Sequence, residues 1–101
     1  MPTLQVLYPT PTDAATFDRR YREEHAPMVA ERMPTARFRA WHVAGAPGGG
    51  PAPYHLVAHL EFDSAEAMQA ALGSPGGRAT ARHAFEISTG GAPVFLVSDP
   101  L

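Results

Sequence analysis

YHLVAHLEF, residues 54–62, is the stretch that most clearly predicts its own structure. Apolar and polar side chains alternate along it, as they do in a strand with one buried face. The face expected to point into the core carries Leu56, Ala58, Leu60 and Phe62. The opposite face carries His55, Val57, His59 and Glu61. Ser64 follows as a helix N-cap, so a helix is expected over Ala65–Leu72.

Outward from this stretch, the same signals predict further strands at Thr3–Tyr8, Arg37–Ala44 and Val94–Val97. Further helices are expected at Ala14–Met33, with Asp13 as its N-cap, and more weakly at Arg78–Phe85. The glycine- and proline-rich residues 45–53 are expected to form a long hairpin loop, with a lid over a pocket as the alternative. The order β-α-β-β-α-β predicts an α+β, ferredoxin-like fold, in which a four-stranded antiparallel sheet carries its helices on one face.

Composition limits the classes of protein that this chain can represent. With 101 residues and 45% hydrophobic content, residues 1–101 are expected to form one domain with a modest core. The net charge of −2 and the absence of a basic cluster argue against nucleic-acid and membrane-surface binding. Without cysteine, the chain has no disulfide, thiol chemistry or cysteine-based metal site. No signal peptide or membrane-spanning segment is recognisable, so a cytoplasmic location is expected.

The first helix carries the strongest candidate for chemistry, in the sequence FDRRYREEHAP at residues 17–27. Phe17, Tyr21 and His25 recur at intervals of four and share one helical face. Pro27 lacks an amide proton, so the helix is expected to bend or loosen near His25. The buried stripe is expected to contain Phe17, Tyr21, Met28 and the stem of Arg32, with His25 and Val29 at its edge. His25 could exchange protons while Tyr21 holds an oxyanion, or His25 could simply bond a freed backbone carbonyl.

Polar residues on the strands offer weaker candidate sites. His59 and Glu61 are neighbours on one strand face and are expected to form a polar pair rather than a metal site. His55 lies too far along the same face from His59 to share an ion with it. Trp41 is expected either in the core or as a platform for a ligand. Tyr8 ends the first strand, where its hydroxyl could meet a ligand or water.

A sheet covered by helices on one side leaves its other face bare. The residues expected on this face are Leu7, Val57, Phe95 or one of its neighbours, and either Trp41 or His42. Such a face is too apolar to remain in water. The economical solution is a symmetric homodimer, in which the two open sheet faces close over an interior cavity for a small hydrophobic molecule.

Two long stretches of the chain resemble the EthD-type proteins, a family of dimeric α+β barrels. LYPTPTDAATFDRRYREEHAPM, residues 7–28, resembles the opening of that family, with LYP, then FD, then Tyr and His-x-Pro. PYHLVAHLEFDSAEAMQAALGSP, residues 53–75, resembles its middle block, and STGG precedes the last strand. The resemblance matches Phe17, Tyr21 and His25 to family positions. Many members carry an Asp before an Asn-Phe pair, where this chain has His83, followed by Glu86-Ile87; His83 is therefore a candidate to replace that acid.

The resemblance also implies a function. The family is named for a small protein encoded with a cytochrome-dependent monooxygenase system for ether degradation. Relatives on the same barrel include cofactor-free monooxygenases, polyketide cyclases, decarboxylases and lactone isomerases. The implied activity is cofactor-independent acid–base chemistry on a hydrophobic or aromatic molecule, with no cofactor and no metal. The expected catalytic residues are His25, Tyr21 and His83. The expected substrate-binding residues are Tyr8, Phe17, Trp41, His59, Glu61 and Phe85.

Two other readings of the chain stay open. One is a non-catalytic binding or accessory protein of a monooxygenase system, and the other is a structural dimer with a collapsed, dry barrel. The sequence contains neither a nucleotide-binding glycine motif nor a nucleophile elbow, so nucleotide handling and covalent acyl transfer are not expected.

Overall fold

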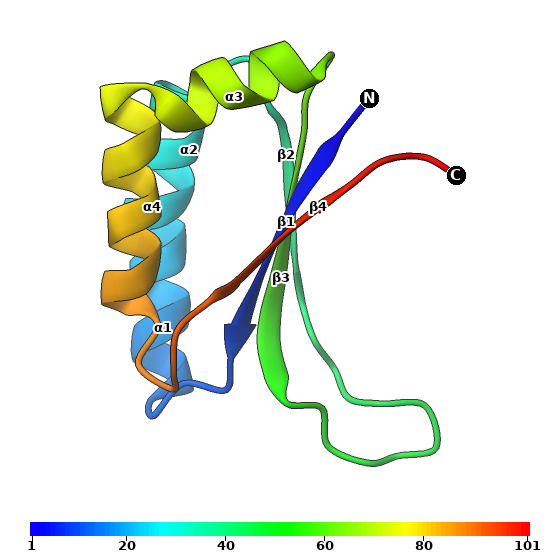
Figure 1. Cartoon of the computed structure of the whole chain (residues 1–101). Coiled ribbons are helices and arrows are strands. Elements are labelled where there is room, and N and C mark those ends of the chain that lie inside the picture. Colours follow the sequence, from blue (N-terminus) through cyan, green and yellow to red (C-terminus); the bar gives the residue numbers. More distant parts are fainter.

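The computed structural model describes residues 1–101 and shows a four-stranded antiparallel sheet with all helices on one face (Figure 1). The strands are β1 (Thr3–Pro9), β2 (Arg37–His42), β3 (Tyr54–Glu61) and β4 (Val94–Ser98). The helices are α1 (Ala14–Arg20), α2 (Ala26–Arg32), α3 (Ala65–Gly73) and α4 (Pro75–Ile87). The strand order β2-β3-β1-β4 is that of a ferredoxin-like fold, so the predicted fold class is confirmed.

Helices α1 and α2 form one continuous rod, joined by a π-helical segment, Tyr21–His25. Asp13 begins the rod as predicted, since its carboxylate accepts a hydrogen bond from the Thr16 amide at 3.1 Å. The loosening predicted near His25 is the π-helical segment itself, which ends at His25, two residues before Pro27. Single π-turns inside α-helices occur frequently at functional sites.

The π-helical segment also changes which side chains of the rod are buried. The buried residues recur at every fourth position: Phe17, Tyr21, His25, Val29 and Met33. In a regular helix of 3.6 residues per turn, steps of four drift steadily around the axis. The wider π-turn offsets this drift and keeps one stripe against the sheet. The predicted burial of Met28 and Arg32 is therefore wrong, because Met28 is only half-buried and Arg32 is exposed.

Helix α4 is longer than the predicted Arg78–Phe85 because it begins at Pro75. The Ser74 hydroxyl accepts a hydrogen bond from the Gly77 amide at 3.0 Å, and proline is well suited to the first position of a helix. Gly77 permits the tight corner between α3 and α4, since a Cβ there would lie 1.9 Å from the Ala71 carbonyl oxygen. The two predicted helices left residues 73–77 between them, but in the structure these residues end α3 and begin α4.

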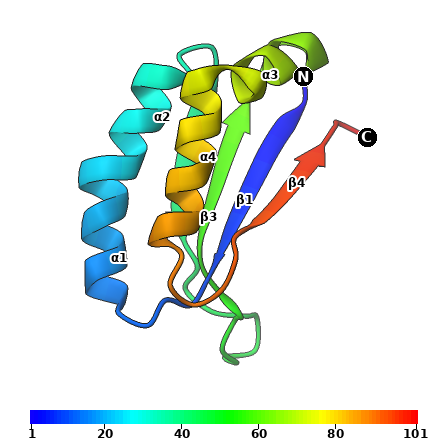
Figure 2. The same ribbon diagram turned by 60° about the vertical axis from the view of Figure 1, so that its left-hand side comes forward.

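The core lies between the helices and the sheet face that they cover. Figure 2 shows α4 running beside the rod formed by α1 and α2, with both over the strands. The core side chains of β1 and β3 alternate as predicted: Leu4, Val6 and Tyr8, and Leu56, Ala58 and Leu60. The open face carries Leu7, Val57, Trp41, Val94 and Leu96, and of these Trp41 and Leu96 are among the exposed large side chains. Phe95 instead faces the helices and lines a cavity there.

The hairpin loop between β2 and β3 extends away from the helices and the sheet (Figure 1). Its residues 45–53 line none of the cavities described below. The structure therefore does not support the alternative that this loop is a lid. None of the helices has both the length and the apolar character that crossing a membrane requires.

Candidate active site

The centre of the candidate site is a hydrogen-bonded pair of buried side chains from β1 and the π-helical segment. The Tyr8 hydroxyl lies 3.3 Å from His25 Nε2, and both residues are at most 4% exposed. Aromatic edges hold the pair in place, since the Tyr8 ring meets Phe17 and Tyr21 at centroid distances of 5.2 and 5.6 Å. Neither ring nitrogen of His25 bonds a backbone carbonyl, so the structural role considered for it from the sequence is not the one observed.

From His25 the hydrogen bonds continue outward to the protein surface. His25 Nδ1 lies 3.0 Å from His83 Nδ1 on α4, and the two imidazoles are stacked 10° from parallel. His83 Nε2 lies 3.1 Å from a carboxylate oxygen of Glu24, whose side chain is 40% exposed. Arg20 anchors Glu24 at 3.0 Å and also reaches Glu86. A chain of four side chains thus joins a buried hydroxyl to a solvent-accessible carboxylate.

The direction of every hydrogen bond in this chain follows from Glu24. Arg20 and then His83 lower the pKa of Glu24, so its carboxylate is ionised and can only accept. His83 Nε2 must then donate, and in the tautomer of His83 that carries its only proton on Nε2, Nδ1 accepts. His25 therefore donates from Nδ1 and accepts at Nε2, and Tyr8 is the donor of the last bond. With both histidines neutral, all protons point from the buried end toward Glu24.

Burial keeps the inner members of the chain uncharged. It lowers the pKa of His25 to about 4, with a further contribution from the nearby His83 imidazole. It raises the pKa of Tyr8 well above its usual range, and Tyr21 adds to this effect. Burial alone raises the pKa of Tyr21 in the same way. At neutral pH the site therefore presents a neutral imidazole and two protonated phenols.

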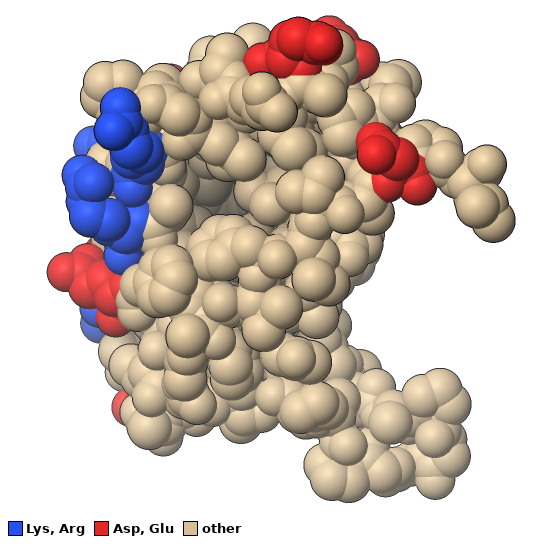
Figure 3. Space-filling view, viewed as in Figure 1, with Lys and Arg blue, Asp and Glu red and all other residues tan.

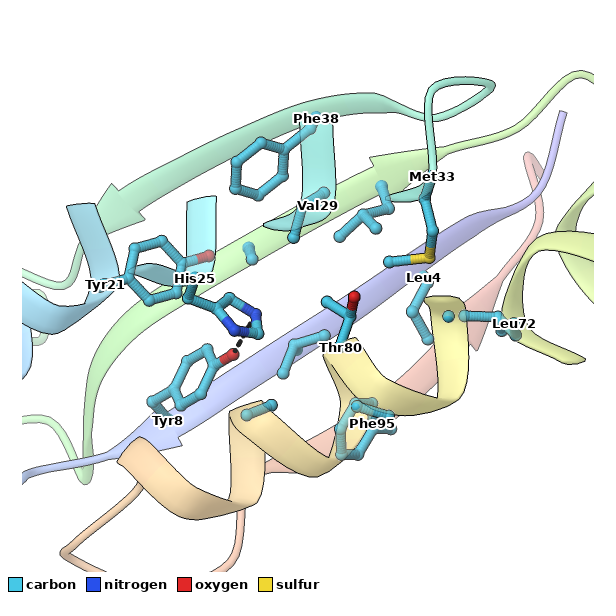
Figure 4. Close-up of a pocket in the computed structure, with 16 residues that line it drawn as sticks. Leu4, Tyr8, Tyr21, His25, Val29, Met33, Phe38, Leu72, Thr80 and Phe95 are labelled. Atoms are coloured by element: carbon cyan, nitrogen blue, oxygen red, sulfur yellow. Dashed lines mark hydrogen bonds between the residues drawn. The ribbon is translucent and has the colours of Figure 1, made fainter. Parts of the chain in front are cut away.

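Tyr21 differs from its neighbours because its buried hydroxyl has no hydrogen-bond partner. Figure 4 shows the rings of Tyr8, Tyr21 and His25 gathered at one end of an apolar pocket. The void in this pocket is about 30 Å³, which holds only one or two water molecules. A buried hydroxyl without a partner is unusual and calls for an explanation, such as a bound group that the hydroxyl would meet.

Two larger grooves adjoin this void. One, of about 280 Å³, lies between the first helical rod and β2 and shares Tyr21 and Phe38 with the void. The other, of about 540 Å³, lies between α4 and β4 and shares Phe95 and Leu72 with it. Arg78 and Arg82 also line this second groove. On the face drawn in Figure 3, the surface is hollowed beside arginine side chains.

The structure brings together most, but not all, of the residues expected at the site. His25, Tyr21, His83, Tyr8 and Phe17 form one contiguous cluster between the helices and the sheet. Three others lie on the opposite, open face of the sheet: Trp41, His59 and Glu61. Phe85 is exposed on α4, where it stacks on Phe95 at 5.7 Å and lines the 540 Å³ groove. The sheet therefore separates His59 and Glu61 from the cluster, whereas Trp41 also lines the 280 Å³ groove that Tyr21 lines.

One contact predicted on the open face, between His59 and Glu61, is wrong. His59 and Glu61 do not pair with each other, because each has a nearer partner. Gln5 Nε2 lies 3.4 Å from His59, and the Trp41 ring meets the imidazole edge-on at 4.7 Å. Glu61 is instead bonded to Arg37 at 2.8 Å.

A second polar cluster was not anticipated from the sequence. The Asp18 carboxylate oxygen Oδ1 lies 2.8 Å from His55 Nε2 and 3.0 Å from His42 Nε2. Burial opposes ionisation of Asp18, but the hydrogen bonds from His55 and His42 lower its pKa. The expected position of His55 beside His59 on the open face is wrong. Pairing between β1 and β3 is irregular between Tyr8 and Pro9, which lets His55 turn toward α1.

Glu24 is the member of the hydrogen-bonded chain that sequence reasoning missed. It has the charge and the position of an ordinary solvent-facing helix residue, and it forms an i,i+4 pair with Arg20. Its partner His83 is 59 residues away in sequence. Only the packing of α4 against the first helical rod brings the two together, so no local signal identifies Glu24.

The unpartnered hydroxyl leads to a prediction about stability. Tyr21→Phe is expected to raise the free energy of unfolding by about 1 kcal/mol, because it removes a buried polar group that bonds nothing. The matched variant Tyr8→Phe is expected to lower it by about 1 kcal/mol, because His25 loses its partner. Urea denaturation of both variants beside the parent protein measures the difference. A destabilised Tyr21→Phe protein would mean that the Tyr21 hydroxyl is bonded in solution.

Comparison with known proteins places this chain in a family. The family model for the EthD domain matches residues 9–85. A protein of Rhodococcus erythropolis, described as an uncharacterized 11.0 kDa protein in the thcB-thcC intergenic region, is 30% identical over 94 residues. That match spans 93% of this chain and 90% of the relative.

Solved structures agree with this assignment. The chain is similar to an ethyl tert-butyl ether degradation (EthD) family protein from Bacillus halodurans, with a TM-score of 0.89 and 25% identity, covering 100% of this chain and 99% of that one. An EthD-like protein from Ralstonia eutropha has a TM-score of 0.72 and 26% identity, with 97% and 89% covered. A more distant structure from Bacteroides fragilis shares the fold and is described as a dimeric protein of unknown function. It is 13% identical, with a TM-score of 0.66, and the match covers 97% of this chain and 94% of that one. On the family model and these two EthD structures, the chain belongs to the EthD family.

Proposed function

We propose that this chain is a cofactor-independent enzyme that moves a proton on a small hydrophobic or aromatic substrate. One observation carries the proposal: an unbroken hydrogen-bonded chain runs from Tyr8 through His25 and His83 to Glu24. It connects an apolar pocket to a carboxylate that water can reach. A chain of this kind can take a proton from a buried substrate without leaving a charge on the buried side chains of Tyr8 and His25.

The proton transfer balances along the chain. The substrate gives a proton to the Tyr8 oxygen while Tyr8 passes its own to His25 Nε2. His25 passes its Nδ1 proton to His83, and His83 passes its Nε2 proton to Glu24. Only two charges change: the substrate becomes negative and Glu24 becomes neutral, so neither histidine needs to hold a positive charge. This matters because the low pKa of His25 makes a buried imidazolium costly.

Tyr21 is proposed to stabilise the negative charge that the substrate gains when it loses its proton. Its hydroxyl is protonated, buried and unpartnered, so it is free to donate a hydrogen bond to an oxygen on which negative charge develops. Such a hydrogen bond strongly stabilises the negative charge that develops on the substrate oxygen, because the Tyr21 hydroxyl is already positioned and little water competes for it. His25, Tyr21 and His83 are thus proposed in the catalytic roles expected from the sequence, with Tyr8 and Glu24 added.

The shape of the pocket limits the substrate class. The 30 Å³ void accepts only a small polar group, such as the oxygen of an enolisable carbonyl or of a phenol. The body of the substrate would lie in the adjoining 540 Å³ groove, whose lining includes Phe85, Phe95 and Val97. Aromatic side chains that stack on one another at the groove favour a flat, aromatic ligand.

A deuterium-exchange experiment tests the proposal without knowledge of the natural substrate. The protein is incubated in D₂O with a panel of aryl ketones, aryl 1,3-diketones and phenols, and carbon-bound deuterium is measured by mass spectrometry. Exchange faster than in buffer is expected for at least one compound. Glu66→Ala, at an exposed position of α3 that lines none of these cavities, is the control and should exchange at the parental rate.

The main alternative is a non-catalytic binding or accessory protein of a monooxygenase system. The small volume of the void favours it, because a full substrate does not fit beside His25 as the side chains stand. This alternative predicts compounds that bind and raise the melting temperature but exchange no faster than in buffer. That result would overturn the enzyme proposal.

We also propose that the chain forms a homodimer through its open sheet face, as the similar fold described as dimeric suggests. The apolar side chains of this face, including the exposed Trp41 and Leu96, support the proposal. Native mass spectrometry of the purified protein should show two subunits, and a co-purified organic mass would identify a ligand. A monomer at micromolar concentration would contradict the proposal. The expected cytoplasmic location stays a prediction.

A further inference from the structure

We propose that Asp18, His42 and His55 bind a divalent transition-metal ion. Their three ligand atoms lie within 4.8 Å of one another. The trio joins α1, the last residue of β2 and the irregular start of β3. It shares no residue with the chain from Tyr8 to Glu24, so the inference does not rest on the proposed proton transfer. It also departs from the sequence-based expectation that the protein holds no metal.

The spacing of the ligand atoms suits a small ion. Asp18 Oδ1 lies 2.8 Å and 3.0 Å from the two Nε2 atoms. Two ligands at the bond lengths of tetrahedral zinc lie about 3.3 Å apart. The two distances from Asp18 Oδ1 would therefore need to change by only a few tenths of an ångström, while the two imidazole Nε2 atoms, which lie within 4.8 Å of each other, would come to the same spacing.

The surroundings of the trio hold it in place. The His55 ring meets Phe17 at 5.4 Å and the His42 ring at 5.1 Å, both edge to face. The side chains of Asp18 and His55 are about one-fifth exposed, whereas that of His42 is 47% exposed. No arginine pairs with Asp18, although five other acidic side chains of this chain each pair with an arginine. The carboxylate thus pairs with two imidazoles and with no arginine, although Arg22 lines the same groove.

The chemistry of the donors indicates which ions would bind. Two imidazoles and one carboxylate suit Zn²⁺, Co²⁺, Ni²⁺, Cu²⁺ and Fe²⁺, whereas Mg²⁺ and Ca²⁺ prefer oxygen ligands. Three protein ligands leave at least one coordination position open, as in catalytic zinc sites. Asp18 and His42 both line the 280 Å³ groove that Tyr21 also lines. An oxygen of a molecule in that groove could therefore fill the open position.

Cobalt titration tests this site directly. Chelator-treated protein is titrated with Co²⁺, whose visible absorption reports on its coordination, and the bound Co²⁺ is then displaced with Zn²⁺. Saturable binding of one Co²⁺ per chain is expected. His42→Gln, His55→Gln and Asp18→Asn should each weaken binding by at least about 10-fold, since even outer-shell partners of metal sites contribute that much.

Matched controls separate this site from other histidines. His59→Gln lies on the open face and His83→Gln lies in the proton chain, and both should bind Co²⁺ as the parent does. Circular dichroism without metal confirms that each variant is folded. The proposal is overturned if the parent shows no saturable binding, or if a folded His42→Gln or His55→Gln protein binds as tightly as the parent.

Discussion

Replacing His25 with alanine is expected to slow enzyme-catalysed deuterium exchange by about 10²- to 10⁴-fold, the usual contribution of a positioned acid–base group. The reason is that His25 alone connects Tyr8 to His83. Without the imidazole, a proton taken up by Tyr8 has no route to Glu24. The measurement is the initial exchange rate of the best compound from the panel, at saturating concentration, for parent and variant.

Two further variants separate proton transfer from simple loss of structure. Glu24→Gln keeps an oxygen that accepts from His83 but cannot take up the proton, so exchange should fall while the melting temperature changes little. His83→Asp places a carboxylate where many EthD-type proteins carry one, and it can still accept from His25. It should therefore retain more activity than His83→Gln. If folded His25→Ala exchanges as fast as the parent, the catalytic role of His25 is wrong.

The fold could be predicted because its signals are local and repeated. The alternation in residues 54–62 identifies β3 and both of its faces, apart from His55. The helix caps Asp13 and Ser64 lie where the sequence places them. The start of α4 was missed because Ser74 and Pro75, which favour a helix start, are followed by two glycines that argue against one. The observed helix shows that the capping interaction outweighs the low helix propensity of these glycines.

The candidate site was predictable only in part, for a physical reason. Spacing in one helix identifies Tyr21 and His25, and the family resemblance identifies His83. Their assembly depends on how α4 packs against the first helical rod, which no local pattern encodes. The π-helical segment shows the same limit, since one wider turn moves His25 from the edge of the buried stripe into its centre. The irregularity in β3 likewise moves His55 to the side of Asp18.

Between pH 7 and pH 5, His25 is expected to lower the free energy of unfolding by about 2 kcal/mol. The pKa of His25 falls from its ordinary value of 6.5 to about 4 in the folded protein, chiefly because of burial. In this pH range the unfolded chain therefore binds a proton that the folded chain does not. The contribution of the neutral His25 to stability is complete above the pKa of His25 in the unfolded chain. It declines as the pH falls toward the pKa of His25 in the folded protein.

Carboxylates do not interfere in this range. Asp13, Asp18 and Glu24 have lowered pKa values in the folded protein, and their ordinary values are 3.8 to 4.5. Their contribution to stability is therefore lost mainly below pH 5, as protons bind to the unfolded chain. The groups that face His25 from its neighbours are Tyr8, Tyr21 and His83, and burial keeps both phenols protonated.

Urea denaturation at pH 5, 6 and 7 and constant ionic strength measures the expected slope. His25→Gln removes the titrating group, so the fall between pH 7 and pH 5 should be about 2 kcal/mol smaller than in the parent. His59→Gln, on the open face, should keep the parental slope. Equal slopes in the parent and His25→Gln would show that His25 binds a proton in the folded protein as readily as in the unfolded chain. The buried end of the chain would then carry a charge at mildly acidic pH, and the neutral relay from Tyr8 to Glu24 could not operate there.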